Sequence, residues 1–223
     1  MPEQRDYALL LRLIPYSESS LVLHLLTEKH GRISLMARGA RRAKSTFRAG
    51  LMPLHQLHIR WLETRSGSMG TLVEVQRLSP LLPESKMLAG QALNAKASSL
   101  FHEGDAHGYA ELSLAMSMLA ERPEESGVCA GVWKMLEASG WTGDLEHCWN
   151  CDEAIDLNQT MFWRQGHLLC GSCAENQGFT LSSGLRKSIS GHLNASFTQL
   201  TPEYITLWEM MINDTIKNHQ IGN

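Results

Sequence analysis

Four of the five cysteines stand in two pairs, and this pattern constrains the fold more than any other feature of the sequence. The pairs are Cys148-x2-Cys151 and Cys170-x2-Cys173, separated by 18 residues. A CxxC turn lets two thiolates point at one metal ion, and two such turns supply the tetrahedral sulfur set that Zn²⁺ prefers. Because four protein ligands leave no open position for water, the sequence predicts a structural Zn²⁺ site in a module at residues 145–176.

Four other uses of these cysteines fit the sequence less well. Disulfides form in oxidising compartments, and nothing in the sequence indicates secretion. A redox CxxC leaves the second pair unexplained, and iron–sulfur clusters use other ligand spacings. A catalytic zinc of the nucleoside-deaminase kind needs H-x-E followed by P-C-x-x-C, and His147 stands beside Cys148 without that arrangement. The fifth cysteine, Cys129, lies in a helical stretch and is predicted to be a small buried residue.

The first 80 residues have the pattern of five short strands. The predicted strands are at residues 7–14, 20–27, 32–37, 55–63 and 71–78. In the fourth, alternation puts Leu57, Ile59 and Trp61 on one face, and a glycine-containing turn at 64–70 leads into the fifth. Five strands in so short a segment, without a helical period, favour a small barrel. An OB-fold and an SH3-like barrel both fit this pattern.

The pattern changes at "SPLLPES", residues 79–85, which predicts a boundary between one domain at 1–80 and another at 81–223. Beyond it, apolar residues recur at helical spacing. A last helix is expected to begin at Thr201-Pro202-Glu203, since Thr can cap, Pro fits the first turn and Glu suits the helix dipole. Its buried stripe would be Ile205, Trp208 and Ile212. The expected fold class is α+β: an N-terminal five-stranded OB-fold-like barrel, then a mainly α-helical domain with the zinc module inserted.

Charge is distributed unevenly along the chain, whose formal net charge is -3. Residues 1–80 hold 12 Lys/Arg against 6 Asp/Glu, whereas residues 81–223 hold 8 against 17. Between Glu28 and Glu63 there is no acidic residue, and solvated faces usually mix signs. Cations that cluster after the third strand predict a phosphate-binding loop, with Phe47 and Trp61 as candidates for base stacking, although Trp61 fits a barrel core equally well. These cations are Arg38, Arg41, Arg42, Lys44 and Arg48.

Motifs for other functions are absent from the sequence. It contains no phosphate loop, dinucleotide-binding turn, H-E-x-x-H or nucleophile elbow, so we expect a protein that is not an enzyme. No run approaches the ~18 apolar residues of a membrane span. The N-terminus carries Glu and Asp where a signal peptide needs positive charge. We therefore expect a soluble, cytoplasmic protein.

Three segments resemble the bacterial RecO family of recombination mediators. "YSESSLVLHLLTEKHGRISLMARGARRAKS", residues 16–45, is similar to the start of the family: a Tyr-x-Glu turn, an apolar strand ending in Thr, a Gly-Arg pair and a basic loop. "MLEASGWTGDLEHCWNC" and "FWRQGHLLCGSC" resemble the segments that lead into the cysteine pairs of its zinc-containing members. The resemblance runs from about residue 5 to the final helix. Where the family often has Gly after the second cysteine this chain has Asp152, so the turn of the first pair is expected to differ.

The resemblance implies a function and a set of partners. It implies an OB-fold, a helical domain that carries structural zinc, binding of single- and double-stranded DNA, and annealing of complementary strands. The implied partners are the RecR protein and the acidic tail of single-stranded-DNA-binding protein, which together help to load the RecA recombinase in the bacterial nucleoid during DNA repair. A zinc-ribbon adaptor that binds only proteins is the alternative. The implied zinc ligands are the four paired cysteines, and the implied DNA contacts are Arg32, Arg38, Arg41, Arg42, Lys44 and Arg48.

Overall fold

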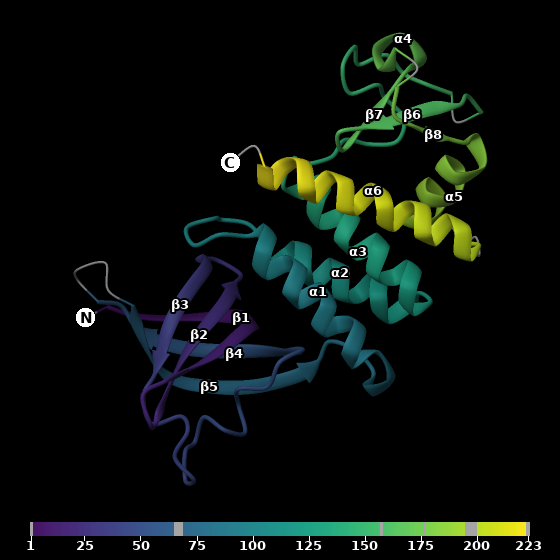
Figure 1. The fold of residues 1–223 in the computed structure, drawn as a ribbon. Helices are drawn as coiled ribbons and strands as arrows, with labels where there is room; N and C mark the ends of the chain where they lie inside the picture. Colours follow the sequence, from purple (N-terminus) through teal and green to yellow (C-terminus); the bar gives the residue numbers. More distant parts are fainter. Residues whose placement is uncertain (1, 65–68, 157, 176, 195–199, 222–223) are drawn as a thin grey trace. The chain divides into compact units, whose positions relative to one another are not determined.

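The computed structural model describes residues 2–64, 69–156, 158–175, 177–194 and 200–221. The chain forms two compact units, Met1–Glu121 and Arg122–Asn223. The strands of the first unit end at Pro80, and its two helices follow them (Figure 1). Which parts fold independently is a separate question, so the division into domains at 1–80 and 81–223 stays a prediction.

The first unit contains a closed barrel of five strands. They are β1 (Glu3–Tyr16), β2 (Ser20–Thr27), β3 (Gly31–Ala37), β4 (His55–Leu62) and β5 (Gly70–Pro80). The strand order is β1-β2-β3-β5-β4, with β4 also paired to β1. Neighbouring strands are antiparallel except β3 and β5, which pair in parallel at Leu35–Gly70 and Met36–Thr71. The predicted OB-fold-like barrel is confirmed; residues 65–68 of the predicted 64–70 turn lie outside the described residues.

Alternation along the strands fills the barrel interior. Leu57, Ile59 and Trp61 of β4 are at most 3% exposed, as their period-2 spacing predicts. They pack with inward-facing residues of the other strands in one apolar cluster. Trp61 also contacts the His30 ring edge-on, with ring centroids 5.0 Å apart. Trp61 is therefore a core residue, and its ring is not available to stack on a base.

Two helices complete the first unit, α1 (Met87–Leu100) after the short 3-10 helix η1 (Glu84–Lys86), and α2 (Tyr109–Glu121). The apolar residues that recur at helical spacing in α1, Ala89, Leu93, Ala97 and Leu100, are buried. Asn94 on the same face donates from Nδ2 to the Leu10 carbonyl at 2.9 Å, where the pairing of β1 with β2 is irregular. Lys86 donates to the carbonyls of Leu119 and Ala120 at the end of α2, where a cation suits the helix dipole.

The Gly31-Arg32 pair at the start of β3 joins the barrel to the end of α1. Gly31 has φ +63°, and a Cβ there would lie 1.8 Å from the Asp105 carbonyl oxygen. The Arg32 amide donates to that same carbonyl at 3.3 Å. The Arg32 guanidinium donates to the carbonyls of Ser98, at 2.9 Å, and Phe101. The pair thus holds the α1–α2 connection against β3, and a cation sits where the α1 carbonyls lack helical partners.

Gly31→Ala should lower the free energy of unfolding by about 3 kcal/mol. A left-handed backbone costs a non-glycine residue roughly 1–2 kcal/mol, and overpacking against a backbone carbonyl costs roughly 1–3 kcal/mol more. Gly104→Ala is the matched control, because Gly104 also has a positive φ, +96°, but nothing lies within 4 Å of its added Cβ. Urea unfolding measures both; equal losses in the two variants would contradict the close approach at Asp105.

The second unit packs helices against a small sheet. Its helices are α3 (Glu124–Ala138), α4 (Gly171–Ala174), α5 (Ser183–Leu193) and α6 (Pro202–Ile221). Strands β6 (Met161–Arg164), β7 (His167–Leu169) and β8 (Phe179–Leu181) form an antiparallel sheet with β6 in the centre. None of the helices in the described part of the chain has the length and apolarity that a membrane crossing requires.

Three buried tryptophans form the core of the second unit. Trp133 of α3 lies between Trp163 of β6 and Trp208 of α6, with ring centroids 5.6 and 6.2 Å away, and all three are at most 2% exposed. The start of α6 is confirmed at Pro202, and the Thr201 hydroxyl accepts the Tyr204 amide at 3.4 Å. The sheet and the helices therefore share one core, and the cysteine-bearing segments emerge from it.

Candidate metal centre and nucleic-acid interface

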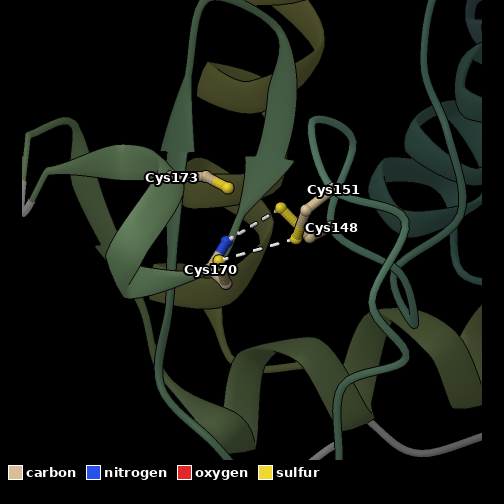
Figure 2. Close-up of side chains that lie close together, drawn as sticks. All are labelled: Cys148, Cys151, Cys170 and Cys173. Atoms are coloured by element: carbon tan, nitrogen blue, oxygen red, sulfur yellow. Dashed lines mark hydrogen bonds between the residues drawn. The ribbon is translucent and has the colours of Figure 1, made fainter.

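The four paired cysteines converge on one point in the second unit. Figure 2 shows Cys148 and Cys151 on a loop and Cys170 and Cys173 around the start of α4. The four sulfur atoms all lie within 4.8 Å of one another, and the Sγ atoms of Cys151 and Cys170 are 3.9 Å apart. Zn–S bonds of about 2.3 Å give a tetrahedron with edges of about 3.8 Å. The cluster therefore has the dimensions of a site that holds one metal ion.

Each pair is presented by a turn that closes in the same way. The amide after the second cysteine donates to the carbonyl of the first: Asp152 to Cys148 at 2.8 Å, and Ala174 to Cys170 at 2.9 Å. Asp152 has φ +56°, in the left-handed region that glycine favours and that Asp visits at moderate cost. Contrary to the expectation of a different turn, Asp152 adopts a backbone conformation that glycine would also adopt.

Backbone hydrogen bonds fix the first pair against the sheet. The Cys148 amide donates to the Glu153 carbonyl at 3.0 Å, and the Trp149 amide donates to the Leu168 carbonyl of β7 at 2.9 Å. The Cys170 amide donates to the Cys148 sulfur at 3.3 Å. These bonds set the distance between the two turns.

Arg186 of α5 supports the same loop from inside the unit. It is fully buried, and its guanidinium donates to the carbonyls of Leu145, Asp156 and Gln159 at 2.6 to 3.1 Å. Burial lowers the pKa of Arg186 from its ordinary value. Sequence reasoning missed this residue. The one signal was its position beside Leu185 and three before Ile189, on the buried face of a helix.

The thiols differ in how readily they ionise. Burial raises the pKa of Cys148, but the amides of Cys170, Cys151 and Asn150 more than offset this and lower it to about 6. At Cys151 the Glu153 amide lowers the pKa, but the neighbouring thiols Cys148, Cys173 and Cys170 raise it to about 12. Once one thiol has ionised, its negative charge opposes the ionisation of a second thiol nearby. A cation placed among the sulfurs would offset this repulsion. A cluster of four sulfurs with this property fits a metal site.

The loop between β3 and β4 carries the predicted basic cluster. Its side chains Arg38, Arg41, Arg42, Lys44 and Arg48 are all exposed. Ala40 and Leu51 in the same loop are buried in the barrel core, and Phe47 packs against it. The loop is therefore attached to the barrel at three points, two of them between its cations. Phe47 is partly buried against the core and anchors the loop, so less of its ring is exposed for base stacking.

Two of the predicted DNA contacts have partners within the protein. Arg41 donates from its amide to the Ser19 carbonyl and from Nη1 to the Ser17 carbonyl, both at 2.9 Å, which ties the loop to the β1–β2 turn. Arg32 lies apart from the loop, and its guanidinium donates to carbonyls at the end of α1, so its DNA contact stays a prediction. The four other loop cations make no side-chain hydrogen bond or ion pair among the described contacts.

Comparison with known proteins gives the family. Residues 1–81 match the family described as "Recombination protein O N terminal". The DNA repair protein RecO of Vibrio atlanticus is 32% identical over 177 residues, which are 74% of this chain and 69% of that protein. The chain belongs to the RecO family. The RecO protein of Vibrio parahaemolyticus is 34% identical over 163 residues, which cover 68% of this chain and 63% of that protein. The RecO protein of Glaesserella parasuis is 29% identical over 184 residues, which cover 79% of this chain and 75% of that protein.

The family match covers one of the two candidate sites. The family match at residues 1–81 includes the barrel and the whole basic loop. The cysteine cluster lies outside that match, so the evidence for a metal site there is the geometry of the four sulfur atoms. The RecO-family chain thus combines a barrel that bears exposed cations with a separate unit that bears a metal site.

Proposed function

We propose that this chain is a non-enzymatic recombination mediator that binds single- and double-stranded DNA and anneals complementary strands. One observation carries the proposal: an anchored, strongly basic loop projects from an OB-fold-like barrel in a member of a DNA repair family. OB-folds commonly bind oligonucleotides. In recombinational repair, the annealing protein would also help to load the RecA recombinase.

The loop cations would bind phosphates. Arg38, Arg42, Lys44 and Arg48 are exposed, while Arg41 holds the loop to the β1–β2 turn. Each phosphate contact releases condensed counterions, which supplies free energy without reading the base sequence. Because Ala40, Phe47 and Leu51 already fix the loop, it loses little conformational freedom on binding.

Annealing needs no covalent step. Two complementary strands repel through their phosphates, and a surface that neutralises part of this charge lets them approach and pair. The protein would therefore act by binding and release.

The metal is proposed to be Zn²⁺ in a structural site. Four sulfur ligands suit Zn²⁺ or an iron–sulfur cluster, and the spacing of the two CxxC pairs favours zinc. Cys148, Cys151, Cys170 and Cys173 would hold it. Zinc bound by four thiolates supplies folding free energy and leaves no open position for a substrate.

The second unit is proposed to contact proteins. Residues 122–223 hold 6 Lys/Arg against 12 Asp/Glu, a charge that disfavours phosphates. The family resemblance points to RecR and to the tail of single-stranded-DNA-binding protein as partners, with RecA acting downstream in the nucleoid. Because that tail is acidic, its site would need a local basic or apolar groove.

An annealing assay tests the proposal. Two complementary oligonucleotides, labelled with a donor and an acceptor fluorophore, should pair faster with the protein present, and both should keep their length on a denaturing gel. Shortened strands would indicate a nuclease and overturn the non-enzymatic assignment. No acceleration together with no DNA binding at low salt would favour the zinc-ribbon adaptor that binds only proteins.

A further inference from the structure

We propose that Tyr16 is a base-stacking residue that lets the basic loop prefer single-stranded over duplex DNA. The inference rests on the proposed DNA-binding function and adds a residue that is not among the predicted contacts. Tyr16 is the last residue of β1 and pairs with Ser20 across the β1–β2 turn. Tyr16 is 57% exposed, so a large apolar ring is left in contact with solvent.

The turn that follows Tyr16 is bonded directly to the basic loop. Ser17 has φ +54°, so the chain reverses immediately after the tyrosine. Arg41 donates to the carbonyls of Ser17 and Ser19, each at 2.9 Å. These two bonds hold the turn and the loop together, so Tyr16 lies directly beside a turn that contacts the phosphate-binding loop.

The other aromatic residues of the first unit are less suited to this role. Phe47 packs against the barrel core, and Trp61 is 3% exposed. Tyr109 is partly buried, and its hydroxyl accepts from the Gln56 side chain at 2.9 Å. Tyr7 is 42% exposed, but it lies at the far end of the β1–β2 pairing from the turn, with its ring 5.4 Å from that of His58. Among the described residues of this unit, Tyr16 is the most exposed aromatic.

A ring beside phosphate-binding cations has a specific consequence. Proteins that bind single strands combine a positive surface with aromatic rings on which bases stack, whereas the bases of a duplex already stack on each other. A tyrosine carries no charge at neutral pH, so it adds affinity without adding a phosphate contact. Its contribution should therefore depend on strandedness and be independent of salt.

The test compares Tyr16→Ala with Tyr16→Phe, and with Tyr7→Ala as the matched control. Fluorescence anisotropy measures binding of a labelled 20-nucleotide oligo-dT and of a 20-base-pair duplex across a salt series. We expect Tyr16→Ala to weaken single-strand binding on the order of 10-fold, with an unchanged salt slope and a change below about 2-fold on the duplex. Tyr16→Phe keeps the ring and should bind like the wild type, and so should Tyr7→Ala.

Each other outcome overturns the inference in a recognisable way. Equal losses on both DNA forms would mean that the substitution disturbs the loop and that no base stacks there. Unchanged single-strand binding would remove Tyr16 from the site while leaving the DNA-binding function intact. A similar loss in Tyr7→Ala would show that the effect is not specific to this turn. If the wild type binds neither oligonucleotide, the proposed function fails and the role of Tyr16 fails with it.

Discussion

Cys148→Ser should release the metal and unfold much of the second unit. Cys148 is fully buried, and its sulfur accepts the Cys170 amide, so it connects the two halves of the cluster. A structural zinc site in a small domain contributes roughly 10–16 kcal/mol of apparent binding free energy at neutral pH. Loss of one of four ligands removes most of this, and the melting temperature should fall by more than about 10 °C.

Cys129→Ser is the control for this prediction. Cys129 is also buried, at 2% exposed, but it lies on α3 outside the cluster, and burial raises its pKa to about 12. It should keep one metal per chain and lose only the modest stability of a buried polar substitution. Metal content after dialysis and thermal unfolding followed by circular dichroism measure both variants. EDTA should lower the melting temperature of the wild type and leave that of Cys148→Ser unchanged; equal metal content in the wild type and Cys148→Ser would refute the four-sulfur site.

Replacing Arg38, Arg42 and Lys44 together with glutamine should weaken binding to single-stranded DNA on the order of 100-fold near 0.1 M salt. Each phosphate contact on a single strand contributes about 0.7 to the slope of log affinity against log salt, so the slope should become shallower by about 2. Arg41 is left intact because it bonds to the β1–β2 turn, and its loss would mix structural and electrostatic effects.

The control makes the same change of net charge elsewhere on the first unit, at Arg5, Arg12 and Arg77, which are also exposed. It should leave the salt slope within experimental error of the wild type. Circular dichroism establishes that both triple variants remain folded. An equal fall in the two variants would mean that overall charge, and no particular loop, determines binding. An unchanged slope in the loop variant would place the phosphate contacts elsewhere.

Local sequence patterns were sufficient to predict most of the fold. The period-2 pattern placed Leu57, Ile59 and Trp61 inside the barrel, because alternate residues of a strand share a face. The capping residues located the start of α6 at Pro202. The paired cysteines brought their sulfurs within reach of one ion because ligand spacing is itself a local property of tight turns.

Residues whose role depends on distant partners could not be assigned in this way. The Arg32 guanidinium meets a carbonyl 66 positions away, at Ser98, and no periodicity in β3 indicates that contact. Arg186 has the composition of a surface residue, yet it binds carbonyls 27 to 41 positions earlier. Phe47 stands in a polar, basic segment, and its partial burial follows from how the loop folds back onto the barrel. In each case tertiary contact overrides the local signal.

The short parallel pairing of β3 with β5 has a consequence for how the barrel assembles. β1, β2 and β3 can form from neighbouring hairpins. Among the described residues, the β3–β5 seam joins Leu35–Gly70 and Met36–Thr71 across more than thirty intervening residues. Such closure must overcome the entropy of a long loop for the gain of few bonds, so it belongs late in folding. The same seam should exchange its amide hydrogens before the β1–β2 ladder does, because few bonds must break to open it. The β3–β4 loop begins directly after this seam, at Arg38. Local opening of the β3–β5 pairing would therefore displace the basic loop before the rest of the barrel.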